Sequence, residues 1–298
     1  MPVTTSLVGA QLEPATHTVD ARWAMAYAAA IDDTNDRYFD TTRADGVVAH
    51  PMFAVCPEWP VIVSGRAASE RWNITADETR RSVHATHDLT VHRLIRAGDL
   101  LTTTAVYTGV EQRRPGAFVS IRLETRDSDG ELVATTDQGN LYLGVHTVGD
   151  DRPASSPATG LEHPVADAEG APGEPPIGVR VDVPRGAAHT YTECARIWNP
   201  IHTDEAVALA AGLPGIILHG TATMALAVSR IVDAFADGDP HRVRRIVGRF
   251  AAQVPRPSSI MVRHQRNRPT PGGSTTISYD VLTESGGLAI DRGVVLID

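Results

Sequence analysis

Residues 198–220 read WNPIHTDEAVALAAGLPGIILHG, and the rest of the chain is interpreted outward from this stretch. It contains Asn-Pro-Ile-His at 199–202 and His-Gly at 219–220. From the His-Gly pair to Ala236, apolar residues recur at helical spacing, which predicts a long helix that begins at that pair. The first N–H groups of a helix have no intrahelical partner, so this helix start can stabilise a developing negative charge.

The sequence around the first histidine has a counterpart in the first half of the chain. Residues 27–40, YAAAIDDTNDRYFD, align with residues 191–204, YTECARIWNPIHTD. An apolar stretch with helical character follows the motif in both halves. In the first half this stretch, residues 50–65, carries Pro57 and Pro60, and we expect its helix to be short or irregular.

A segment without hydrophobic periodicity separates the two halves. Residues 147–178 are rich in Pro, Gly, Ala, Ser and acidic residues, a composition typical of a linker. We therefore predict an N-terminal domain over residues 1–146 and a C-terminal domain over residues 179–298.

Each half ends in predicted antiparallel strands. Turn-forming sequences separate them, namely RAGD, RRPG and DSDG in the first half and PRPS, RPTPGG and SGG in the second. A helix followed by a strand meander is an α+β arrangement, and two such units side by side would build one continuous curved sheet. The predicted strands cover residues 88–94, 100–110, 117–126, 131–144, 245–254, 259–268, 274–284 and 288–298.

Composition argues against several classes of function. The net charge of −9 argues against nucleic acid as a partner, because phosphate binding needs clustered positive charge. The chain has no lysine, and its 27 basic residues are all arginine, which excludes Schiff-base chemistry and a P-loop. No stretch approaches the ~20 apolar residues of a membrane span, and the N-terminus lacks the features of a signal peptide. With only two cysteines, we expect a cytoplasmic protein without disulfides.

The closest pair of histidines does not predict a metal site. His84 and His87 lie in a stretch that alternates like a strand, where residues three apart face opposite sides. We therefore expect no bound metal.

The motifs together resemble those of the MaoC-like, (R)-specific enoyl-CoA hydratases. That family has Gly-Asp-x-Asn-Pro-(Leu/Ile)-His followed by Ile-(Leu/Val)-His-Gly, and this chain has the related residues with similar spacing at 196–220. The segment RSVHATHDLTVHRLIRAGDLL at 81–101 resembles a second family pattern. The likeness covers nearly the whole chain outside the linker and the N-terminal tail. It implies a double hot dog fold, in which two helix-plus-sheet units form a pseudo-dimer.

The resemblance also implies a function. It is that of a lyase that hydrates 2-enoyl thioesters or dehydrates 3-hydroxyacyl thioesters of CoA or acyl carrier protein, in fatty acid or polyketide metabolism. His202 would act as the base beside Asn199, and the Gly220 N–H would stabilise enolate character on the thioester oxygen. The family implies no cofactor apart from the CoA or phosphopantetheine of the substrate, and often a homodimer. The tunnel wall is expected to include Ile197, Trp198 and His219.

One position departs from the family pattern. The catalytic aspartate of the family falls at Ile197, and the glycine before it falls at Arg196. Isoleucine can neither accept a proton nor orient a water, and loss of one member of an acid–base pair costs a factor of ~10²–10⁴.

Two carboxylates could compensate for this loss. In the first half Asp33 stands at the aspartate position while Tyr38 replaces the histidine, so the halves hold complementary parts of one motif. Asp33 could pair with His202 across the interface, or Glu193 could replace the aspartate. The alternative is that these residues, and His202 itself, are structural.

Three functions therefore remain open from the sequence. The first is the lyase. The second is other proton-transfer chemistry in the same tunnel, such as isomerisation, cyclisation or thioester hydrolysis, for which a single histidine suffices. The third is a non-catalytic subunit that binds acyl thioesters. A carboxylate within reach of His202 would favour the first, a lone histidine the second and a blocked tunnel the third.

Overall fold

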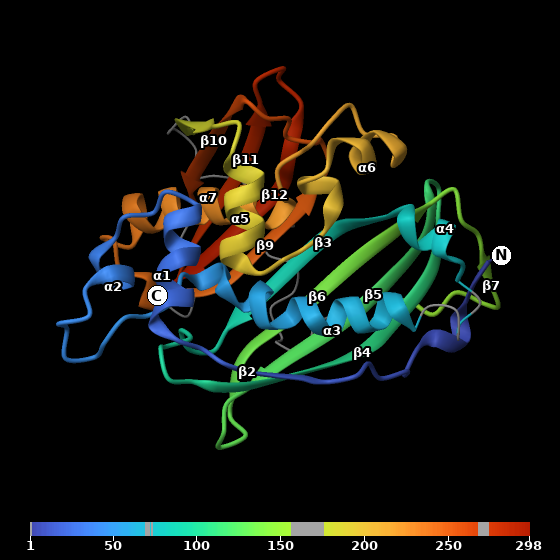
Figure 1. Ribbon diagram of the computed structural model, residues 1–298, viewed down its shortest axis with the longest axis horizontal. Helices are drawn as coiled ribbons and strands as arrows, with labels where there is room; N and C mark the ends of the chain where they lie inside the picture. The colour runs from blue at the N-terminus through green and yellow to red at the C-terminus, as the bar shows by residue number, and fades with distance from the viewer. Residues whose placement is uncertain (1, 69–71, 73, 156–175, 268–273) are drawn as a thin grey trace.

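The computed structural model describes residues 2–68, 72, 74–155, 176–267 and 274–298. Ten strands form one antiparallel sheet in the order β2-β4-β5-β6-β3-β9-β12-β11-β10-β8 (Figure 1). Five come from each half of the chain, and the halves join where β3 pairs with β9. The α+β class and the single continuous sheet predicted from the sequence are therefore confirmed. The strand bounds are β2 Ala15–Thr18, β3 Ser82–Val91, β4 Leu100–Arg113, β5 Gly116–Arg126, β6 Leu132–Leu143, β8 Ile177–Val183, β9 Val243–Phe250, β10 Ser258–Arg266, β11 Thr275–Thr283 and β12 Leu288–Ile297.

Differences from the predicted strands lie at the edges and in the linker. The two edge strands, β2 and β8, were not predicted, and β8 begins inside the expected linker. At the other end of the linker, β7 (Thr147–Val148) pairs in parallel with β1 (Val3–Thr4). Residues 156–175 of the linker lie outside the described residues.

One long helix in each half packs on the sheet. In the C-terminal half α7, Gly220–Phe235, begins at the predicted pair and is buried over most of its length. In the N-terminal half α3, Val55–Ala67, follows the 3-10 helix η2 (Pro51–Ala54) and crosses the strands of its half (Figure 1). The expectation of a short or irregular helix was wrong. Pro57 falls in the first turn, where its N–H would have no helical partner, so only Pro60 removes an internal bond.

The internal repeat is visible in two matched pairs of residues. Helices α1 (Ala21–Ala30) and α5 (Ala187–Ala195) pack together, and the hydroxyls of Tyr27 and Tyr191 lie 3.2 Å apart. Asp32 and Arg196, which occupy equivalent positions, both adopt left-handed backbone angles, with φ of 52° and 59°. Glycine adopts this left-handed conformation without strain, which explains why the family motif has glycine at the position that Arg196 occupies in this chain.

A buried ion pair joins the two halves at the centre of the sheet. The guanidinium of Arg245 on β9 donates from Nε to Oδ1 of Asp88 on β3 at 2.7 Å and from Nη2 to Oδ2 at 2.6 Å. The two side chains are only 3% and 13% exposed. Such a bidentate pair fixes the register between β3 and β9.

Short helices complete the described structure, and none of its helices has the length and apolar character needed to cross a membrane. Their bounds are η1 Thr5–Leu7, α2 Asp36–Phe39, α4 Ala76–Arg80, η4 Pro200–His202, α6 Glu205–Ala210 and η5 Pro240–Arg242.

Candidate active site

His202 lies at the end of η4, and one of its two ring nitrogens forms no hydrogen bond with the described residues. The side chain of Asn199 caps η4 by accepting a bond from the Ile201 N–H at 3.5 Å. Nδ1 of His202 lies 2.9 Å from the carbonyl oxygen of Ile217, which can only accept, so Nδ1 carries the proton. Burial lowers the pKa of His202 to about 4, although the hydrogen bond to Ile217 opposes the shift. The ring is therefore neutral at pH 7, and Nε2 can accept a proton.

His219 stacks on this ring and precedes the start of α7. The ring centroids of His202 and His219 lie 3.6 Å apart. Burial holds the pKa of His219 well below its usual range, so it too is neutral. His219 is the N-cap residue of α7 without a side-chain cap, which leaves first-turn N–H groups such as that of Gly220 without a side-chain acceptor. A Cβ at Gly220 would lie 2.9 Å from the Phe250 ring, so packing against this ring favours glycine here.

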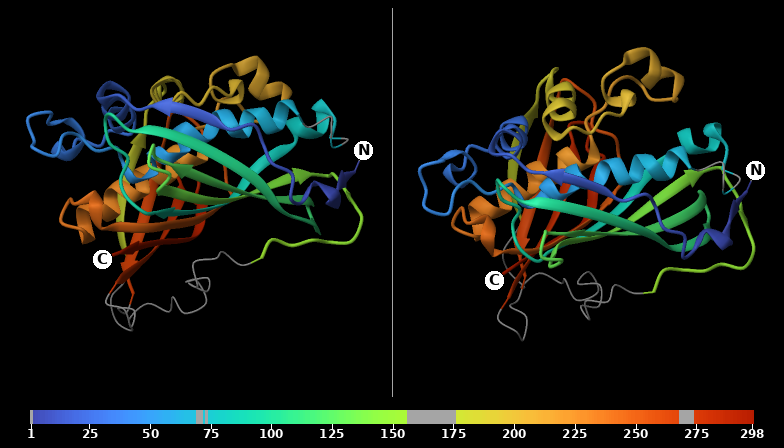
Figure 2. Two further views of the ribbon diagram at one scale, coloured as in Figure 1. Left: turned by 90° about the horizontal axis from the view of Figure 1, so that it is seen from below. Right: turned by 60° about the horizontal axis from the view of Figure 1, so that its bottom comes forward.

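A cavity of about 550 Å³ adjoins both histidines and Gly220. Its walls come from both halves of the chain. The C-terminal half contributes parts of the segment from Ile197 to Thr223, together with residues 250–254 and Ala289. Within that segment α6 does not line the cavity, and both views in Figure 2 place it on the same side of the sheet as α3. The volume lies within the range of ordinary small-molecule sites.

The N-terminal half contributes one face of α3 and parts of β3 and β6. Val55, Glu58, Trp59, Ile62 and Arg66 follow helical spacing and all line the cavity. This wall was not predicted from the sequence. The helical spacing of its residues was the available signal, but the two prolines indicated an irregular helix without a defined face.

Several groups on this wall are polar. Glu58 is 1% exposed and accepts a hydrogen bond from the Thr136 hydroxyl at 2.5 Å. The Arg66 guanidinium packs over the Trp59 ring, with Cζ 4.9 Å from the ring centroid, and within the described residues it forms no ion pair. His84 on β3 and Gln138 on β6 also line the cavity. The site therefore contains polar groups contributed by both halves.

The predicted orientation of the two neighbouring histidines was wrong. The register between β3 and β6 shifts between His84 and Thr86, so an extra residue, Ala85, interrupts the alternation. The rings of His84 and His87 consequently lie 5.3 Å apart. The described part of the chain contains no group of three side chains suited to hold a metal ion.

Four of the expected site residues lie outside the cavity, and two of them, Trp198 and Glu193, lie beside the motif. Trp198 is 59% exposed, so its assignment to the tunnel wall was wrong. Glu193 is exposed, accepts from the Trp198 indole N–H at 3.4 Å and does not line the cavity. Ile197 and His219 do line the cavity.

Asp33 and Tyr38 belong to a separate buried cluster in the N-terminal half. Oδ2 of Asp33 lies 3.9 Å from Nε2 of His50, and the Tyr38 and His50 rings are 5.7 Å apart. Nε2 of His50 also lies 3.2 Å from the Ser229 hydroxyl. None of these residues lines the cavity, so the structure does not bring Asp33 and Tyr38 to His202.

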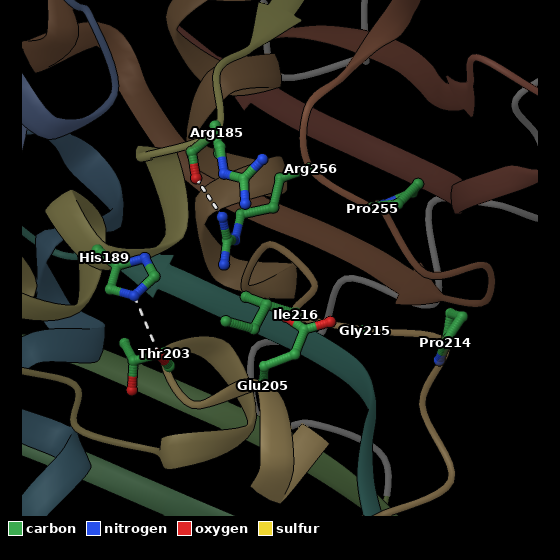
Figure 3. A pocket seen from close by; sticks show the side chains of 9 residues that line it. All are labelled: Arg185, His189, Thr203, Glu205, Pro214, Gly215, Ile216, Pro255 and Arg256. Atoms are coloured by element: carbon green, nitrogen blue, oxygen red, sulfur yellow. Dashed lines mark hydrogen bonds between the residues drawn. The ribbon is translucent and has the colours of Figure 1, made fainter. Parts of the chain in front are cut away.

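A second pocket, of about 480 Å³, lies beside the segment that carries His202 (Figure 3). Arg185 and Arg256 face each other there, and Nη1 of Arg256 donates to the Arg185 carbonyl at 2.5 Å. Nε2 of His189 lies 3.0 Å from the Thr203 carbonyl, directly after His202. Neither arginine has an ion-pair partner in the part of the chain that the structure describes. Most other arginines of the C-terminal half are paired, as Arg249 is with Asp291.

Comparison with known proteins agrees with this architecture. The MaoC like domain matches residues 167–285, and the FAS1-like dehydratase domain region matches residues 6–136. A MaoC-like dehydratase from Phytophthora capsici superimposes with a TM-score of 0.77 over 99% of this chain and 97% of its own, at 18% identity. The fold and the paired motifs thus define a double hot dog protein.

Several proteins are similar to this chain in sequence. A UPF0336 protein of Streptomyces griseus is 31% identical over 114 residues, which are 37% of this chain and 73% of that protein. The peroxisomal multifunctional enzyme type 2 of Drosophila melanogaster is 28% identical over 165 residues, or 55% of this chain and 26% of the enzyme. The chain thus matches only about a quarter of that enzyme's length. The chain belongs to the MaoC-like dehydratase family, and a probable enoyl-CoA hydratase 2 of Dictyostelium discoideum is 28% identical to it over 100 residues, or 34% of this chain and 33% of that protein.

Proposed function

We propose that this protein is a lyase that adds water to 2-enoyl thioesters, or removes it from 3-hydroxyacyl thioesters. One observation carries the proposal: a neutral histidine with a free Nε2, His202, shares a cavity with the uncapped start of α7 at Gly220. The first supplies a base and the second an oxyanion donor.

His202 and the Gly220 N–H act at different steps of the hydration. Water attacks the β-carbon of the enoyl thioester while His202 takes a proton through Nε2. Electron density moves to the thioester oxygen, where the Gly220 N–H and the dipole of α7 stabilise it. The α-carbon must then gain a proton. The apolar side chain of Ile197 can neither donate this proton nor form a hydrogen bond to the water.

A second candidate is double-bond isomerisation or cyclisation. No carboxylate of the described residues is hydrogen-bonded to His202, and its nearest partners are Ile217 and His219. A single imidazole can remove and return an α- or γ-proton without activating water. A cavity of about 550 Å³ beside His202 supports both enzyme functions, whereas a blocked tunnel would favour a non-catalytic subunit.

The second pocket is the candidate site for the phosphates of the thioester carrier. Arg185 and Arg256 form no ion pair with the described residues, and guanidinium groups can bind phosphate through forked hydrogen bonds; their pocket adjoins residue 203 of the motif segment. We expect Arg256→Gln to raise KM for CoA thioesters about tenfold, equivalent to ~1.4 kcal/mol, with little change in kcat. The measurement compares CoA thioesters with the same acyl groups on N-acetylcysteamine, which lacks phosphate. An equal rise in KM for both carriers would contradict this assignment.

Incubation of the protein with a panel of 2-enoyl-CoA thioesters tests the proposed lyase. Hydration appears as a mass gain of one water and as loss of the absorbance of the conjugated double bond. A loss of absorbance without mass gain would favour isomerisation. Binding of the thioesters with neither change would overturn both enzyme functions.

A further inference from the structure

One carboxyl group shares the cavity with His202. Among the described residues that line the cavity, Glu58 is the only one with a carboxyl side chain. It comes from α3 of the N-terminal half, whereas His202 comes from the C-terminal half. At 1.5 Å per residue, the α3 face from Val55 to Arg66 extends about 16 Å along the cavity, with Glu58 near its start.

Glu58 is held in its uncharged form. Burial raises the pKa of its carboxyl to about 8, although the Thr136 hydrogen bond opposes this shift. A buried ionised carboxylate without a cation would be costly, and the described residues provide no ion pair to Glu58. Thr136 occupies one carboxyl oxygen, Oε1, which leaves the rest of the group available to a ligand.

We propose that Glu58 is the second catalytic residue of this site and, together with His202, forms an acid–base pair built across the two halves. The proposal rests on the proposed lyase function and explains how the site works without the aspartate that Ile197 replaces. The acid comes from the long helix of one half and the base from the motif of the other.

The atoms balance in this scheme. The oxygen of water bonds to the β-carbon, and one of its protons moves to Nε2 of His202. The electron pair of the double bond passes through the enolate to the α-carbon, which takes the proton of the Glu58 carboxyl. This leaves an imidazolium and a carboxylate, and return of the proton from His202 to Glu58 resets the site. Dehydration follows the same steps in reverse.

The two carboxylates that the sequence suggested do not fit the role. Glu193 is exposed and bound to Trp198, and Asp33 lies with His50 in its own buried cluster. The thiol of Cys56 lies near Glu58, but burial raises its pKa well above the usual value, so it stays uncharged.

The pair predicts a bell-shaped pH profile for hydration. His202 must be neutral, so activity is lost as pH falls through about 4. Glu58 must be protonated, so activity is lost as pH rises through about 8. The other ionisable groups facing the cavity are Arg66 on α3, His84 on β3 and His219 before α7. Burial keeps His84 and His219 neutral, and Arg66 stays charged across the pH range of the profile.

Glu58→Gln is the direct test, because glutamine can still accept the Thr136 hydrogen bond but cannot donate a proton as an acid. We expect hydration to fall by ~10²-fold or more, and any residual rate to lack the limb near pH 8. The matched control, Glu193→Gln, should retain its rate. Hydration by Glu58→Gln at the wild-type rate, or retention of the limb near pH 8, would overturn the proposal.

The melting temperature of Glu58→Gln shows whether its loss of hydration activity comes from the missing acid or from misfolding. The folded protein keeps a proton on Glu58 that the unfolded chain releases above its usual pKa of 4.5, so stability from this group falls as pH rises from 4.5 to about 8. Glu58→Gln removes this dependence and should melt at or above the wild-type temperature at pH 7. A much lower melting temperature would invalidate the activity comparison, and the infrared measurement below then decides.

Infrared difference spectroscopy tests the contact with ligand independently of turnover. The carbonyl stretch of a protonated carboxyl should shift when wild type binds a saturated acyl-CoA, and the same band should be absent in Glu58→Gln. No ligand-induced change in that band would overturn the role of Glu58 even if wild type hydrates enoyl thioesters. A shift without hydration by wild type would place Glu58 at the ligand and contradict the lyase function instead.

Discussion

Replacing His202 by alanine is expected to slow hydration of a 2-enoyl thioester by a factor of ~10²–10⁴, the usual contribution of a general base. Nε2 of His202 forms no hydrogen bond with the described residues, whereas Nδ1 is held by the Ile217 carbonyl. The substitution therefore removes the base and leaves the start of α7 in place. Initial rates under subsaturating substrate measure the effect as kcat/KM.

Asparagine at the same position distinguishes the catalytic role of His202 from its structural role. In His202→Asn the side-chain amide can donate to the Ile217 carbonyl in place of Nδ1–H, but nothing replaces Nε2. We expect this variant to be as inactive as His202→Ala and more stable. His241→Ala, on η5 outside the cavity, is the control that should stay active. If kcat/KM fell less than about tenfold in both His202 variants, which corresponds to ~1.4 kcal/mol, a catalytic role for His202 would be contradicted.

The largest expected effect on stability comes from Asp88. Removing its carboxylate by Asp88→Ala leaves the Arg245 guanidinium, 3% exposed, without its bidentate partner. Breaking a buried pair in this way costs about 3–5 kcal/mol. We expect the lower end, because Asp137 also favours the charge on Arg245 and raises its pKa. Denaturant unfolding of wild type and variant gives the difference directly.

A double replacement tests whether the missing partner causes the loss. Substituting Asp88→Leu together with Arg245→Met removes both charges, and such exchanges are often neutral or stabilising. We therefore expect the double variant to recover most of the stability. A loss of less than about 1 kcal/mol in Asp88→Ala would show that the pair does not hold the two halves together.

Local sequence signals were sufficient for most of the fold. Alternating strands between Gly- and Pro-containing turns predicted eight of the ten sheet strands, because each turn sequence requires its own backbone geometry. The edge strands β2 and β8 were missed, and β8 begins within the sequence assigned to the linker. The length of α3 was missed because Pro57 was counted as a helix breaker, although it lies in the first turn.

The site was predictable only where its residues are close in sequence. His202, His219 and Gly220 came from one motif, and all three line the cavity. Glu58 and Arg66 reach it from the other half, which depends on how the two halves pack around the shared sheet. His84 and His87 were placed on opposite faces, because nothing in the sequence marked the bulge at Ala85. Contacts between distant segments and local breaks in strand register thus escaped prediction.

The most direct test of the central claim is the incorporation of oxygen from heavy-oxygen water. Wild-type protein is incubated with a 2-enoyl-CoA thioester in water labelled with oxygen-18, and the product is analysed by mass. The account predicts a 3-hydroxyacyl thioester with one heavy oxygen on its β-carbon, and no such product from His202→Asn. An unlabelled product, or no product from any thioester that the protein binds, would contradict it.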